Sequence, residues 1–137
     1  MAKYEIKKKY LIIYLCLIVV GGILMLCRWL NHIGSDIKLL PDFLLAHITN
    51  FALCMMLLLI FGFVVLIVGG KIKIITITAL LLAILSVVYE CFIPILNTPD
   101  IWDAIFSVAG IALAFAYLVM LKKHGLIAQR SDPSVEE

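Results

Sequence analysis

Three ionisable side chains, His47, Glu90 and Asp103, stand at the ends of otherwise apolar stretches of this chain. A carboxylate beside an imidazole can act as a general base, or it can bind a ligand that carries a positive charge or a hydroxyl group. Such residues within a membrane span are costly enough to indicate a functional site. The sequence has no nucleophile motif, no metal-spaced histidine pair and no phosphate-binding loop. We therefore expect no metal and no cofactor, and catalysis stays an open alternative.

The elements that must position these side chains are membrane-spanning helices. The chain has 137 residues, of which 65% are hydrophobic and 15% charged, and its mean hydropathy is +1.19. That is more apolar surface than one small water-soluble core buries. An all-α domain over residues 1–127 is predicted, with a disordered tail over 128–137. Its four helices are expected at about 10–27, 43–68, 74–93 and 101–121, because roughly 20 apolar residues cross a bilayer.

Lysine and arginine residues predict the orientation of the chain. Nine of the eleven flank the start of the first predicted helix, the turn between the second and third, or the end of the fourth. Since basic residues favour the cytoplasmic side, both termini are expected to be cytoplasmic, in a bacterial cytoplasmic membrane. The first apolar stretch follows three lysines but no small-residue cleavage site, so we expect a retained helix rather than a signal peptide. The net charge of +2 gives no indication of nucleic-acid binding.

Small residues on the third and fourth predicted helices lead to the acids. One stripe reaches Glu90, and the other begins at Asp103 and contains Gly110. Because small residues let membrane helices approach closely, we expect these two helices to pack along the stripes and to bring Glu90 towards Asp103. The stripes are Ala79, Ala83, Ser86 and Glu90 on the third helix, and Asp103, Ser107, Gly110, Ala114 and Tyr117 on the fourth.

The second predicted helix carries a polar stripe of His47, Asn50 and Cys54 at the level of the acids. His47 has two interpretations, a site residue or a histidine that hydrogen-bonds a neighbour. Arg28 also has two, an anchor at the membrane interface or the counter-ion of the acidic cluster.

Other residues near the acids have structural interpretations. Asp42 and Asp100 each begin a helix, so capping is the favoured role for both, and Asp100 is also a candidate site residue. Among the four cysteines, a disulfide between Cys27 and Cys91 is conceivable, but ordinary packing is the better expectation.

The acidic and histidine pattern resembles that of VanZ-like membrane proteins, a family named for a teicoplanin-resistance accessory protein. Asp42 and His47 resemble the family's first pair, Glu90 its glutamate, and "DAIFSVAG" from Asp103 to Gly110 its last element. The similarity covers about residues 41–121. The chain departs from the family pattern at Ile93, Asn97 and Ser107, and in the gap between Asp42 and His47. The resemblance implies a role at the outer face of the bacterial envelope.

Several functions fit these residues. The first is a VanZ-like membrane protein whose outward site engages an envelope lipid, a lipid-linked glycan precursor or a lipophilic antibiotic such as a glycopeptide. That site would comprise Glu90, Asp103, His47, Arg28, Asn50 and Asp100. The alternatives are a structural subunit of a membrane complex and a membrane-embedded enzyme that acts on a lipid-linked substrate. A small exporter usually needs an acid at mid-membrane, and the sequence has none. The sequence does not indicate an oligomeric state.

Overall fold

A computed structural model describes residues 4–33, 41–92 and 100–128 of the chain. It contains four long helices: α1 (Lys8–His32), α2 (Asp42–Ile67), α3 (Ile72–Phe92) and α4 (Ile101–Met120). Each is long and apolar enough to cross a membrane. The prediction of a helical protein with four spans is confirmed, and the chain is a multi-pass membrane protein by the length and composition of its helices.

Helix α1 is longer than predicted. It begins at Lys8 rather than at residue 10 and continues to His32 rather than ending at residue 27, so the predicted long loop from Arg28 is shorter. A fall in hydropathy marks the edge of the hydrocarbon, not the end of a helix, because Lys and Arg are nearly as good helix formers as Leu. The other three helices start and end within two residues of their predicted bounds. The predicted turn between the third and fourth helices, residues 94–99, lies outside the described residues.

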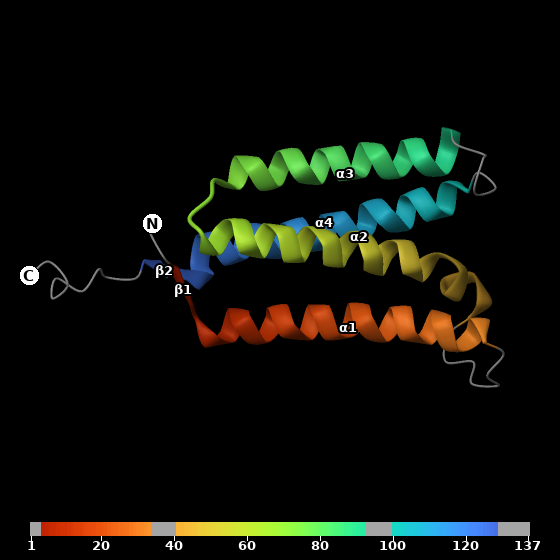
Figure 1. Ribbon diagram of the computed structural model, residues 1–137, viewed down its shortest axis with the longest axis horizontal. Coiled ribbons are helices and arrows are strands. Elements are labelled where there is room, and N and C mark those ends of the chain that lie inside the picture. Colours follow the sequence, from red (N-terminus) through yellow and green to blue (C-terminus); the bar gives the residue numbers. More distant parts are fainter. Residues whose placement is uncertain (1–3, 34–40, 93–99, 129–137) are drawn as a thin grey trace, which may run out of the picture.

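The helices α2 and α4 form the centre of the bundle, and α1 and α3 lie on opposite sides of them (Figure 1). The buried share of the most apolar window is 39% in α2 and 44% in α4, against 6% in α1 and 11% in α3. The core between the central helices is aliphatic and includes Met55, Leu58, Leu59 and Leu118. The outer faces of α1 and α3 consist of exposed Ile, Leu and Val side chains. Lipid solvates such surfaces without cost.

Gly110, in the small-residue stripe of α4, packs against α2 rather than α3, which corrects the sequence-based prediction. A Cβ atom added to Gly110 would overlap the carbonyl oxygen of Phe51 and lie 3.2 Å from its Cα. Further along the pair, a Cβ at Gly62 of α2 would overlap the Leu118 side chain. The two backbones therefore approach closely at Gly110, and the Leu118 side chain packs on Gly62. The spacing identified the stripe correctly but could not say which neighbour would use it.

Helix α3 contacts α4 through a different face of α4. Ala79 and Ala83 of α3 lie at this contact as predicted, but they line a cavity of about 200 Å³. From α4 the cavity is lined by larger side chains, Val108, Ile111 and Phe115, together with Ala112. The contact between α3 and α4 is therefore less complete than the prediction implied.

Two short strands join the two ends of the described chain. β1 (Tyr4–Ile6) pairs antiparallel with β2 (Leu126–Ala128), and Tyr4 is opposite Ala128. A π-helical turn, η1 (Leu121–Gly125), connects α4 to β2, and the Lys7 amide donates to the Gly125 carbonyl at 2.9 Å. The predicted tail began at residue 128, but Ala128 belongs to this sheet, and residues 129–137 lie outside the described residues. Both described ends of the chain thus lie at one end of the bundle (Figure 1), as an even number of spans requires.

The turn between α2 and α3 lies at this same end and depends on glycine. Gly69 has a φ of +86°, a left-handed conformation that glycine adopts without the steric cost of a Cβ. The Gly70 amide donates to the Val65 carbonyl at 2.7 Å, which satisfies a carbonyl in the last turn of α2. Lys71 and Lys73 follow at once, so the lysines of this turn lie at the same end of the bundle as those near β1 and in η1.

Candidate functional site

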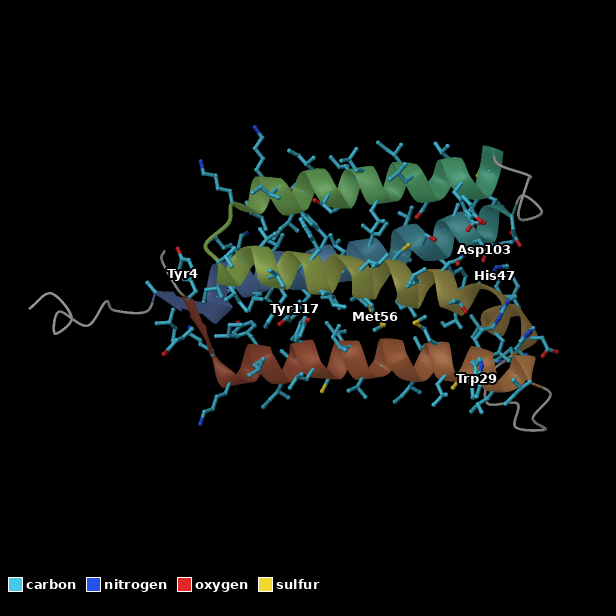
Figure 2. The ribbon with its side chains drawn as sticks, in the orientation of Figure 1. Tyr4, Trp29, His47, Met56, Asp103 and Tyr117 are labelled. Atoms are coloured by element: carbon cyan, nitrogen blue, oxygen red, sulfur yellow. The ribbon has the colours of Figure 1, made fainter. Side chains whose placement is uncertain are left out.

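The candidate site residues gather at the end of the bundle opposite the strands, which we call the polar end. In Figure 2, His47 and Asp103 lie close together at this end, far from Tyr4. Because consecutive helices run in opposite directions, the starts of α2 and α4 meet the ends of α1 and α3 here. Glu90 is two residues from the end of α3, and Asp100 directly precedes α4.

His47 and Asp103 form a direct pair between the two central helices. The distance from His47 Nδ1 to Asp103 Oδ1 is 2.8 Å, and the two side chains are only 8% and 13% exposed. Phe43 and Phe106 pack against the imidazole, with ring centroids 4.8 and 5.6 Å from it. The packed rings and the carboxylate hold the imidazole in one orientation, and the hydrogen bond selects the state with a proton on Nδ1. His47 thus hydrogen-bonds a neighbour, as one of its two interpretations expects, and that neighbour is itself a candidate site residue.

Asp100 caps α4 and also lies near His47. One carboxylate oxygen accepts a hydrogen bond from the Trp102 amide at 2.9 Å and caps α4, so the capping prediction is confirmed. The other oxygen lies 3.8 Å from His47 Nδ1. Asp42 is the first residue of α2, after Pro41 at the cap position, so its carboxylate lies where the helix dipole favours an anion.

Glu90 is buried between α2 and α3, with 7% of its surface exposed. Asn50 Nδ2 donates to Glu90 Oε1 at 3.1 Å. About one helical turn deeper, Cys54 Sγ and Ser86 Oγ lie 3.5 Å apart. The predicted polar stripe of α2 is therefore divided between two neighbours, since His47 faces α4 while Asn50 and Cys54 face α3.

Arg28 bridges α1 to the first turns of α2. Its guanidinium donates to the carbonyls of Leu45 and Ala46, the latter at 2.6 Å. Arg28 also lines the same cavity as Glu90 and Asp103. The structure thus adds a third role to the two that the sequence left open, because the side chain ties two helices together beside the acids.

A cavity of about 370 Å³, here called the polar cavity, opens among these side chains. Its polar lining comes from α1, α2, α3 and α4: Arg28, Thr49, Asn50, Tyr89, Glu90 and Asp103. Glu90 and Asp103 therefore meet at one cavity, as predicted, although α2 rather than a direct stripe contact brings them there. Within the described part of the chain, Thr49 Oγ1 is the one buried side-chain polar atom without a hydrogen-bond partner. Such an atom calls for an explanation, for example a ligand or water in the cavity.

A second space of about 430 Å³ adjoins the polar cavity and lies between α2 and α3, with Ser107 of α4 also in its lining. It shares Asn50, Tyr89 and Glu90 with the polar cavity. Its walls are otherwise mainly aliphatic, so we call it the leucine groove: Leu53, Leu57, Leu82, Leu85 and Val88. Leu53, Leu57 and Leu85 are each between 43% and 64% exposed, so the groove is open to the side, where lipid lies.

Sequence reasoning found most of this site but missed part of it. Glu90, Asp103, Arg28 and Asn50 line the polar cavity. His47 adjoins it through Asp103, and Asp100 lies beyond His47. Thr49, Tyr89 and the leucine groove were not predicted. A threonine in a helix usually donates to the carbonyl four residues earlier, which for Thr49 is that of Leu45. In this structure the Leu45 carbonyl accepts from Arg28 instead, and only the structure shows this. Cys27 and Cys91 are both free thiols, as packing residues would be.

Comparison with known proteins adds no relative to this description. No protein-family model matches the chain, and neither does any curated protein or solved structure. The resemblance to VanZ-like proteins therefore stays a prediction that rests on the residues alone.

Proposed function

We propose that this protein binds an amphipathic molecule of the bacterial envelope at the outer face of the cytoplasmic membrane. The ligand is an envelope lipid, a lipid-linked glycan precursor or a lipophilic antibiotic, as expected of a VanZ-like protein. Its polar head lies in the polar cavity and its apolar chain in the leucine groove.

The observation that carries this proposal is that the two spaces adjoin at shared residues. A polar cavity and an apolar groove that share Asn50, Tyr89 and Glu90 match a molecule with a head and a chain. Glu90 and the unpartnered Thr49 hydroxyl favour a head group that donates hydrogen bonds, while Arg28 offers a positive charge to a phosphate or carboxylate. Ligand sites are typically of this kind, with mostly apolar walls and a few convergent polar groups.

Filling the groove tests this function. Leu85 lines the groove and Ile84 does not, although they are adjacent on α3 and 64% and 58% exposed. Purified protein is titrated with phosphatidylglycerol and, separately, with a polyprenyl phosphate, and bound lipid is counted by native mass spectrometry. We expect Leu85→Trp to weaken binding of the preferred lipid about tenfold, a loss of roughly 1.4 kcal/mol.

Ile84→Trp is the matched control and should change binding by less than about twofold, which is under roughly 0.5 kcal/mol. Equal binding by Leu85→Trp and Ile84→Trp would show that the groove holds no chain.

Glu90→Gln tests the polar cavity in the same assay. If that variant melts like the wild type but loses lipid, the cluster binds ligand; unchanged lipid binding instead favours a structural subunit, in which buried polar groups set the helix register.

A second candidate, a membrane-embedded enzyme, is favoured by one specific observation. The hydrogen bond between Asp103 and the buried His47 orients an imidazole beside the polar cavity, which is the arrangement of a general base. Turnover of a lipid-linked substrate that is lost in His47→Gln, with lipid binding retained, would establish this function.

The orientation of the bundle is part of the proposal. The lysines of the turn after α2 and of the segments beside the strands gather at the strand end, and the positive-inside rule places that end in the cytoplasm. His32 at the polar end and Lys73 near the strand end are both exposed. In a cysteine-free background, His32→Cys should react with an impermeant thiol reagent in intact cells, and Lys73→Cys only after permeabilisation. Reaction of Lys73→Cys in intact cells would reverse the orientation.

A further inference from the structure

We propose that His47, Asp100 and Asp103 form a binding site for one divalent metal ion of the zinc class. No spacing in the sequence predicts this site, because the histidine lies on α2 and the two aspartates at the start of α4. Asp100 and Asp103 are three residues apart, which places them on the same side of that first turn. The packing of α4 against α2 then adds the imidazole.

The distances fit a small ion. One ligand atom from each residue can be chosen so that all three lie within 4.8 Å of one another. His47 Nδ1 is 2.8 Å from Asp103 Oδ1 and 3.8 Å from Asp100 Oδ2. Ligands about 2.0 Å from a tetrahedral zinc ion are roughly 3.3 Å apart, a separation that the two distances bracket. Small side-chain rotations would therefore complete the coordination without movement of either helix.

The donor set and its charge favour the same class of ion. One imidazole nitrogen with two carboxylate oxygens suits zinc and its neighbours, whereas calcium and magnesium prefer oxygen ligands alone. The proton on Nδ1 can be donated to only one of the two aspartates at a time. When a divalent ion binds Nδ1, the proton of the neutral imidazole moves to Nε2, and the ion would satisfy both carboxylates and balance their two charges.

The surroundings of the three residues resemble those of a metal site with an open position. The Trp102 amide orients the Asp100 carboxylate, and Phe43 and Phe106 pack around the imidazole, as outer groups do around metal ligands. His47 is 8% exposed and Asp100 37% exposed, so the cluster is closed on the histidine side and open to water beside Asp100. Three protein ligands and one open position are typical of zinc sites that bind a further ligand.

Metal titration of the full-length protein in detergent tests the proposal. After treatment with a chelator and its removal, zinc chloride is titrated by calorimetry, and cobalt(II) chloride is followed by its visible absorption. We expect one zinc ion per chain and a cobalt spectrum of low-coordinate type. Asp100→Asn should weaken zinc binding at least about tenfold, while its side-chain oxygen still caps α4. His47→Gln should abolish the cobalt spectrum, since the nitrogen ligand is lost.

The controls separate this site from its surroundings and from the proposed lipid function. Asp42→Asn removes a carboxylate at the same end of the bundle and should leave zinc affinity within about threefold, and Leu85→Trp should leave it unchanged even if lipid binding fails. Circular dichroism confirms that each variant is folded. The proposal is overturned if the folded wild type binds no zinc, or if Asp100→Asn and His47→Gln bind it like the wild type.

Discussion

Helix α2 meets its two neighbours α4 and α3 in different ways. Against α4, Gly110 brings the backbones together, and the Leu118 side chain packs on Gly62. Against α3, the groove-lining side chains are Leu82, Leu85, Val88 and Tyr89, with Ser86 as the small exception, and a space of about 430 Å³ remains. One side of α2 is closed and the other is open.

The difference shows how one bundle can combine a rigid pair with an accessible groove. Lipid tails are as apolar as leucine, so membrane helices associate closely only where small residues permit close packing. Glycine permits it between α2 and α4, which holds His47 against Asp103. The large residues of α3 keep it away from α2, and the polar contacts Asn50–Glu90 and Cys54–Ser86 cross the space between the two helices.

The largest expected effect is at the closed interface. Gly110→Ala places a methyl group against the Phe51 carbonyl, which belongs to a helical backbone and cannot turn aside. Overpacking typically costs 1–3 kcal/mol, and we expect about 3 kcal/mol here, measured as a lower free energy of unfolding in detergent.

Gly22→Ala is the matched control for Gly110→Ala. A Cβ at Gly22 meets nothing within 4 Å, so the change should be neutral or stabilise α1 by up to about 1 kcal/mol, the difference in helix propensity. Equal losses of stability at Gly110 and Gly22 would remove the distinction between the two sides of α2.

A smaller effect is expected from the polar contacts on the two sides, measured with chelator present so that no metal contributes. Asp103→Ala removes the partner of a buried imidazole, and we expect a loss of about 1–2 kcal/mol. Ser86→Ala removes a 3.5 Å contact to a thiol beside an open groove, and it should cost less than about 0.5 kcal/mol. A Ser86→Ala loss as large as that of Asp103→Ala would mean that α2 and α3 are held as firmly as α2 and α4.

Much of the fold was predictable because membrane spans depend on local composition. The three later helices begin and end within two residues of their predicted positions. The strands were missed, because β1 and β2 are only three residues each and are stable only as a pair that the bundle brings together. The extension of α1 to His32 was missed for another reason, since polarity was read as the end of a helix.

The candidate site was likewise predicted only in part. Its residues could be identified from the sequence because an ionisable side chain in a membrane span is energetically costly and therefore unusual, whichever neighbour it faces. Their partners were not found: His47 pairs with Asp103 and Asn50 with Glu90, although His47 and Asn50 belong to one predicted stripe. Nothing local distinguishes a residue that faces α4 from one that faces α3.

The sequence by itself determined the four spans and the separation of charges between the two ends, because both follow from apolar length and a constant helical rise. Only the tertiary structure decided which face of a helix packs against which neighbouring helix. The rotation of a helix about its axis depends on which glycines and large side chains meet across an interface, as Gly110 meets Phe51. That rotation joins His47 to Asp103 and leaves the leucine groove open beside Glu90.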